Sequence, residues 1–288
     1  MAKNELAVAQ SFALVGMTDG MDDELKEAWD DEMDDLGNDT SVNMRKIKMP
    51  MAGGNAFQVE SDIEGDPDNK KTFDAVILFS HLMNARWESD YNGEATPPTC
   101  TSYDGKQGAI FETGEIFNCD TCPHNQYGSG ENGVGKTCKN MRRIFMMLSG
   151  QPWLYTFSVP PTSVKEVTKQ LTRITATTRL PLSRLVVRFS LTKGATKARS
   201  GVTKVFVESI GRLDPAAYET TKKMREVIKD QYKNVGIDSG DYETTPQQGG
   251  PVYDAQYQEA SRQAPQQAAG PDGFMEIPDG VQESLPFN

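Results

Sequence analysis

Residues 153–191, WLYTFSVPPTSVKEVTKQLTRITATTRLPLSRLVVRFSL, decide the fold of this chain. Apolar residues alternate through 153–159, which predicts a strand with one buried face, and the Pro-Pro pair at 160–161 ends that strand. An S-x-x-E capping box at 163–166 then opens a stretch with apolar residues at helical spacing. Residues 184–191 alternate again. The order is therefore a strand, a helix and a second strand.

The flanking sequence extends this order in both directions. Downstream, the alternating residues 202–210 follow a basic loop bounded by glycine at 193–201, which predicts a β-hairpin. A helix over 214–233 comes next, with an Asp cap and Pro at its first position. Upstream, the apolar run 72–87 predicts a buried strand, while 141–148 fits a strand or a helix end equally well.

This order favours a mainly β fold with helices, of the α+β class. A small β-barrel of the OB type, with one helix before its last two strands, fits it. We expect three regions: an acidic N-terminal region at 1–70, a core at 71–235, and a tail at 236–288. The tail is rich in Gln, Pro and Gly, a composition typical of disorder.

Charge is strongly segregated along the chain. The 288 residues carry 30 Lys and Arg against 41 Asp and Glu, a net charge of −11. Residues 136–213 alone hold 15 cations and two anions, which is a composition typical of polyanion binding. Residues 18–39 form an acidic amphipathic segment, predicted as a helix capped by Thr18 or Asp19. It either docks on a basic surface or is a solvated terminal helix.

Four cysteines fall within 39 residues of loop-like sequence, with the spacing C-x18-C-x2-C-x15-C. The Cys-x-x-Cys pair lets two thiolates reach one ion, and four thiolates around Zn²⁺ form a closed, structural site. Two disulfides or free core thiols are the alternatives, and His124 is a reserve ligand. The predicted zinc ligands are Cys100, Cys119, Cys122 and Cys138.

Residues 130–137, GENGVGKT, match the phosphate-loop pattern G-x-x-x-x-G-K-[ST]. A phosphate loop follows a buried strand and opens a helix, and neither is indicated here. We therefore interpret these glycines as a turn between zinc ligands. His81 lies in an apolar strand and is expected to be a core histidine. No other catalytic pattern occurs, so the sequence does not indicate an enzyme.

Cations and aromatic residues in short strands are what a single-strand binder needs, because cations track phosphates and aromatic rings stack on bases. Core packing is the alternative role of each aromatic residue. The candidate cations are Lys136, Lys139, Arg142, Arg143, Arg184, Arg188, Lys193, Lys197, Arg199 and Lys204. The candidate stacking residues are Tyr127, Trp153, Tyr155, Phe189 and Phe206.

A zinc loop ahead of a basic OB-like hairpin resembles the phage-type zinc-containing single-stranded DNA-binding proteins. The C-terminal tip, ESLPFN at 283–288, is similar to the acidic Pro-Phe tips of single-strand binders. The resemblance implies sequence-independent coating of single-stranded DNA in phage or mobile-element replication, recombination or repair. It also implies recruitment of replication or repair proteins through the tip, at Glu283, Leu285, Pro286 and Phe287.

Two other functions remain open: a zinc-containing regulator that binds duplex DNA or a polymerase, and a P-loop nucleotide hydrolase. No apolar run is long enough to span a membrane, and no signal peptide is indicated. We expect a soluble, cytoplasmic protein, in the host cytoplasm if a phage encodes it, without a membrane partner.

Overall fold

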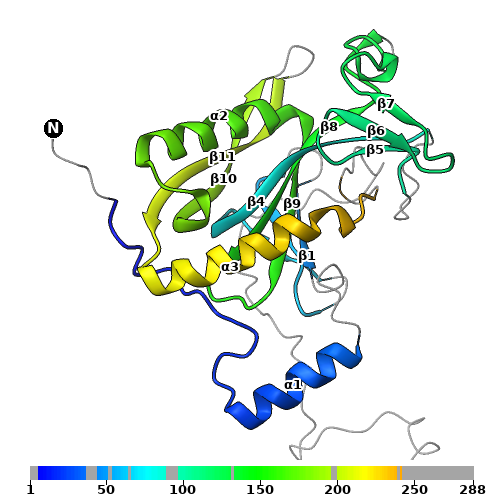
Figure 1. Ribbon diagram of the computed structural model, residues 1–288. Helices are drawn as coiled ribbons and strands as arrows, with labels where there is room; N and C mark the ends of the chain where they lie inside the picture. The colour runs from blue at the N-terminus through cyan, green and yellow to red at the C-terminus, as the bar shows by residue number, and fades with distance from the viewer. Residues whose placement is uncertain are drawn as a thin grey trace, which may run out of the picture. The chain divides into compact units, whose positions relative to one another are not determined.

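The computed structural model describes residues 6–36, 44–50, 54–63, 66–88, 97–130, 133–195, 200–238 and 241. In these ranges eleven strands form one mixed sheet, accompanied by three α-helices (Figure 1). The sheet order is β3-β2-β1-β9-β8-β4-β5-β6-β7, and β10 pairs with β4 and β11. The first strands and helix are α1 (Asp23–Asp35), β1 (Met44–Lys48), β2 (Phe57–Val59), β3 (Asp68–Lys70), β4 (Thr72–Arg86), β5 (Cys100–Ser102), β6 (Gln107–Ile110) and β7 (Ile116–Asn118). The remainder are β8 (Lys139–Leu148), β9 (Leu154–Val159), α2 (Pro161–Thr178), β10 (Leu185–Ala195), β11 (Ser200–Arg212), α3 (Pro215–Gln231) and the short 3-10 helices η1 (Pro123–Asn125), η3 (Leu182–Arg184) and η4 (Tyr232–Asn234).

The long strand β4 organises the sheet. One of its edges pairs with β8, from Ala75 to Ala85. Its other edge pairs first with β10 and, at its far end, with β5. The apolar run predicted as a buried strand is thus confirmed, and β8 settles 141–148 as strand.

The strand, helix and hairpin order predicted from 153–210 is confirmed as β9, α2, β10 and β11. The capping box is wrong: α2 begins at Pro161, and the buried Ser163 hydroxyl instead accepts a hydrogen bond from the Val205 amide of β11 at 3.1 Å. The hairpin is also longer than predicted, because β10 continues to Ala195 and β11 starts at Ser200.

The main core lies on the side of the sheet that α2 covers. It contains four packed rings, with centroid distances from 4.9 to 6.0 Å. They come from β2, β4, β9 and β10, so the core joins strands that are far apart in the sheet order. These rings belong to Phe57, Phe73, Phe157 and Phe189.

The strands β1, β2 and β3 belong to this sheet, although the sequence analysis placed 44–70 in an acidic N-terminal region. β1 runs parallel to β9, and Phe57 and Val59 of β2 are completely buried. The boundary predicted at residue 70 therefore does not coincide with an edge of the sheet. Short strands interrupted by Pro and Gly gave too little periodicity to reveal this.

The closed OB-like barrel is not confirmed, because the sheet is open. Among the described residues β9 and β11 are not paired, and β1 occupies the free edge of β9. A side-chain contact crosses the opening: the Thr203 hydroxyl of β11 donates to the Gly54 carbonyl, ahead of β2, at 3.2 Å. The fold is thus mixed α/β, mostly strands, with an open sheet.

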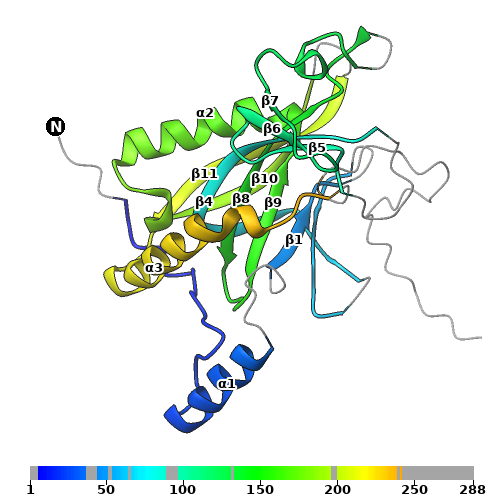
Figure 2. The ribbon, with the colours of Figure 1, turned by 45° about the vertical axis from the view of Figure 1, so that its right-hand side comes forward.

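The helices α2 and α3 pack on different strands, α2 along β11 and α3 across β4 (Figures 1 and 2). Asp214 caps α3 by accepting from the Ala216 and Ala217 amides, as predicted. The acidic helix α1 begins at Asp23, later than expected, because Asp22 caps it by accepting from the Leu25 amide. None of the helices in the described ranges combines the length and apolar character needed to cross a bilayer.

Candidate metal centre and nucleic-acid interface

All four cysteines line one cavity of about 20 Å³, enough for a single water molecule or ion. Cys100 begins β5, Cys119 and Cys122 follow β7, and Cys138 precedes β8. The strand pairs β4–β5, β5–β6 and β6–β7 thus bring together thiols that are 38 positions apart at most. We call β5, β6, β7 and the loop through Cys138 the cysteine module.

Gly108 of β6 makes room for two of the thiols. A side chain at this position would place its Cβ 3.1 Å from Cys100 Sγ and 3.5 Å from Cys119 Sγ. The two sulfurs therefore lie close to the same backbone position of β6. Glycine at this position has no side chain and leaves space for both sulfurs.

The four thiols are free in this structure. Burial and the other three thiols raise the pKa of Cys138 to about 12, and burial followed by Cys119 raises the pKa of Cys100. The described residues hold no group of three or more His, Cys, Asp or Glu side chains already in metal-binding geometry. The four thiols that line the cavity are nevertheless the kind and number of donors that a structural zinc site uses.

An asparagine network fixes the cysteine module to the sheet. The buried Asn125 donates to the Cys119 carbonyl at 2.7 Å and accepts from Asn140 of β8 at 2.8 Å. Asn140 also donates to Asn84 of β4 at 2.6 Å. Lys136 Nζ donates to Asn125 Oδ1 at 3.2 Å. Sequence reasoning missed this network, because isolated asparagines in a loop carry no pattern.

The phosphate-loop match lacks the geometry of a phosphate loop. The amides of Gly128 and Gly130 donate to the Gly135 carbonyl, at 2.7 and 3.4 Å, so they are engaged within the turn. A strand, β8, follows Thr137 and Cys138 where a helix would be required. The interpretation of these glycines as a turn fits the contacts.

The structure brings three of the predicted nucleic-acid contacts together on the outer face of the β10–β11 hairpin. Phe206 is 38% exposed and pairs across the strands with Ser190. Lys204 lies two residues before Phe206, and the exposed Arg188 two residues before Ser190, so all share one face. Lys204 Nζ donates to the Ala195 carbonyl, and Arg188 forms an ion pair with Asp74 at 2.7 Å.

Three of the predicted contacts are buried in this structure, two of them in the main core and Arg143 beneath the segment after α3. Arg143 is 1% exposed and pairs with Asp241. Tyr155 and Phe189 are core residues, with 2% and 0% exposure. Alternation with apolar residues did not separate a stacking face from a core face, and here both strands turn those rings inward.

The other predicted contacts are dispersed. Arg142 is half-buried between β8 and α2, where it donates to Thr168 and Ser80. The Arg184 guanidinium lies over the Tyr218 ring, and Trp153 has Arg45 over its own ring at 4.0 Å. In the cysteine module, Tyr127 is 69% exposed. Lys193 donates to Thr203 on the hairpin, and Lys139 is half-buried at the start of β8.

Residues predicted at Lys197, Arg199 and the C-terminal tip, Glu283, Leu285, Pro286 and Phe287, lie outside the described residues.

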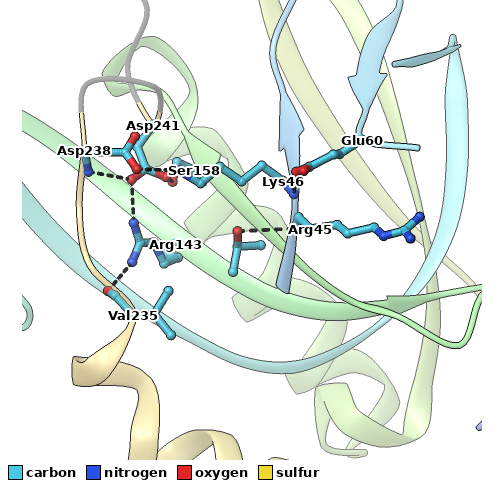
Figure 3. Close-up of polar contacts among 9 residues, drawn as sticks. Arg45, Lys46, Glu60, Arg143, Ser158, Val235, Asp238 and Asp241 are labelled. Atoms are coloured by element: carbon cyan, nitrogen blue, oxygen red, sulfur yellow. Dashed lines mark hydrogen bonds and ion pairs between the residues drawn. The ribbon is translucent and has the colours of Figure 1, made fainter. Parts of the chain in front are cut away.

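A polar cluster that the sequence did not reveal lies on the face of the sheet opposite the main core (Figure 3). Arg143 donates to Asp241 at 2.6 Å and to the Val235 carbonyl at 2.8 Å. Asp241 also accepts from Ser158 of β9 at 2.9 Å, and Asp238 forms an ion pair with Lys46 of β1 at 2.5 Å. The segment after α3 is thus bound to β1, β8 and β9.

His81 of β4 is a core histidine, as predicted, with 8% exposure. Its Nδ1 lies 2.9 Å from the Tyr103 carbonyl and 3.0 Å from the Leu82 carbonyl. Burial lowers its pKa to about 4, and the nearby Arg143 and Arg142 act in the same direction. The side chain is therefore neutral at physiological pH.

Comparison of the chain with family profiles, with curated proteins and with solved structures finds no match.

Proposed function

We propose that this protein binds single-stranded DNA without sequence preference and that its cysteine module holds a structural zinc ion. The observation that carries the proposal is the order and pairing of five strands, with α2 between the third and the fourth. β4 pairs with β8, and β8 pairs with β9. After α2, β10 pairs with the other edge of β4, and β11 then pairs with β10. This is the strand and helix order of an OB-fold, which binds oligonucleotides on its second and third strands and on two flanking loops.

The contents of those two loops support the proposal. The loop between the first and second strand of this arrangement is the cysteine module, with the exposed Tyr127. The loop between the fourth and fifth strand ends the β10–β11 hairpin, whose outer face carries Arg188, Lys204 and Phe206. Cations beside an exposed ring suit a strand of phosphates and bases.

Zinc would be held by Cys100, Cys119, Cys122 and Cys138, and its chemistry there is structural. Four thiolate ligands leave no open coordination position, so the ion would fix the loop and not react. The asparagine network then fixes the loop against β4 and β8.

Fluorescence anisotropy with labelled oligo-dT and with a duplex of equal length tests the function. We expect far tighter binding of oligo-dT than of duplex. Equal affinity for both would favour a duplex-binding regulator instead. ATP turnover that is lost on Lys136→Ala would contradict both binding functions and favour the hydrolase.

The hairpin supplies a matched pair of variants. Phe206→Ala is expected to weaken oligo-dT binding by about 1–3 kcal/mol, the contribution of one stacked base. Phe111→Ala removes a ring outside the predicted set that is more exposed than Phe206, with 69% exposure, and should leave the affinity unchanged. Equal effects of the two variants would argue against a stacking role for Phe206.

A further inference from the structure

A segment made up of residues 235–238 and Asp241 covers a patch of the sheet whose chemistry is complementary to that of a nucleic-acid strand. Beneath it lie the side chains of Arg143, Ser158 and Lys46, on three neighbouring strands (Figure 3). A guanidinium, a hydroxyl and an ammonium are the groups that contact phosphates in nucleic-acid complexes. In this structure the two cations contact carboxylates in place of phosphates, Lys46 that of Asp238 and Arg143 that of Asp241.

The same segment also carries an apolar residue that is buried against the sheet. Ile237 is 5% exposed and packs with Met83 and Met141. Trp87 and Tyr103 pack against the same cluster, so aromatic rings border the position. The segment therefore presents carboxylates to cations and an apolar side chain to an apolar cluster that has aromatic residues packed against it, and phosphates and bases could make the same two kinds of contact.

The fit of the segment is incomplete. Arg143 is almost fully buried, yet its Nε has no hydrogen-bond partner, and neither has Asp238 Oδ1. Buried polar atoms without partners are costly, and the unused Nε–H donor of Arg143 is one that a phosphate, with its several acceptor oxygens, can satisfy.

We infer that the face of β1, β8 and β9 beneath this segment is a phosphate-binding groove, and that single-stranded DNA enters it by displacing the segment. This inference rests on the proposed function, and it adds a binding surface that includes Arg143 and Lys46. β8 and β9 are the second and third strands of the arrangement described above. The apparent affinity for DNA is then the intrinsic affinity multiplied by the fraction of chains in which the segment is released from the sheet.

Displacement can be measured directly on the full chain by hydrogen–deuterium exchange. Saturating oligo-dT should accelerate exchange in the peptide that contains Ile237 and Asp238. Unchanged exchange of this peptide, at a concentration where anisotropy shows full binding, would overturn the inference and leave the proposed function intact.

Affinity provides a second, independent measurement. Asp241→Asn weakens the hold of the segment and should tighten oligo-dT binding by at least about tenfold. Asp68→Asn is the control, because it removes the same charge from an exposed pair with Lys70. Equal affinity of Asp241→Asn and wild type, together with a lower melting temperature, would mean that the segment only stabilises the fold and would overturn the inference.

The contribution of the lysine beneath the segment can be tested with a variant and a matched control. Lys46→Met should weaken binding and reduce the slope of log affinity against log salt by about 0.7, the value for one phosphate on a single strand. Lys70→Met, at an equally exposed lysine, should leave the slope unchanged. Equal slopes for both variants would overturn the role of Lys46. If neither wild type nor Asp241→Asn binds oligo-dT at low salt, the proposed function fails as well.

Discussion

Asn125 accepts a hydrogen bond of 2.8 Å from Asn140, which joins the loop after the Cys-x-x-Cys pair to β8. Asn125 is buried and also donates to the Cys119 carbonyl. The position of one cysteine backbone is thus set by a side chain that is itself held by β8.

Asn125→Ala should weaken both the fold and the metal site. Loss of this side chain leaves buried polar partners unsatisfied, at a cost of about 1–3 kcal/mol in unfolding free energy. Zinc affinity should fall by about 10–100-fold, as expected when a group that orients a ligand is removed. Thermal unfolding and competition with a zinc chelator measure the two effects.

Asn118→Ala is the control for Asn125, since it removes an exposed amide of the same module that bonds only locally, to the Asp120 amide. If both variants change zinc affinity equally, Asn125 has no special role in placing the cysteine.

The purified protein should contain about one zinc ion per chain, measured by elemental analysis. Cys100→Ser and Cys138→Ser should each lower this content strongly after dialysis against a chelator. His124→Ala should leave it unchanged, because four thiols would complete a zinc site even though the exposed His124 lines the same cavity. Zinc loss in the His124 variant with retention in a cysteine variant would assign the fourth ligand to the histidine.

Gly108→Ala should reduce zinc binding through sterics alone. The added methyl group would lie 3.1 Å from Cys100 Sγ, closer than most such contacts allow, so the sulfur must move. Ala109→Val is the matched change, because the neighbouring residue of the same strand points to the opposite face. Unaltered zinc affinity in Gly108→Ala would show that the thiols tolerate this displacement.

Stability should fall as the pH is lowered from 7 to 5, in part because of His81. Its pKa is about 4 in the folded protein and about 6.5 in the unfolded chain. The unfolded state therefore binds the proton first, and the contribution of the neutral ring is present above pH 6.5 and lost as the pH falls towards 4. The predicted loss between pH 7 and 5 is about 2 kcal/mol.

Urea unfolding of wild type and His81→Asn at both pH values measures this contribution. Asn keeps a donor for the Tyr103 carbonyl but does not titrate. The variant should lose less stability than wild type between the two pH values. An identical loss in both proteins would assign the pH dependence to other groups.

The sequence predicted the sheet core well and its periphery poorly, for physical reasons. Long alternating runs, such as those of β4 and β10, report burial on one face directly. The strands β1 and β2 are too short to show a period, and only their pairing with β9 and with each other reveals them.

The candidate site shows the same division. The cysteine spacing predicted a common site for four thiols, and all four line one cavity, while their binding of zinc stays a prediction. Whether a single cation is exposed or buried in an ion pair was not predictable, because this depends on partners far away in sequence. Arg143 and Asp241 are 98 positions apart, and nothing in either local sequence indicates that they form a buried pair.

The salt dependence of oligo-dT binding tests the central claim most directly. If the cations of this fold contact the phosphates of single-stranded DNA, log affinity should fall linearly with log salt, by about 0.7 for each phosphate contacted. With Arg188, Lys204 and neighbouring cations engaged, we expect a slope of about −2 or steeper. Absence of binding at low salt, or an affinity that salt does not change, would contradict the account.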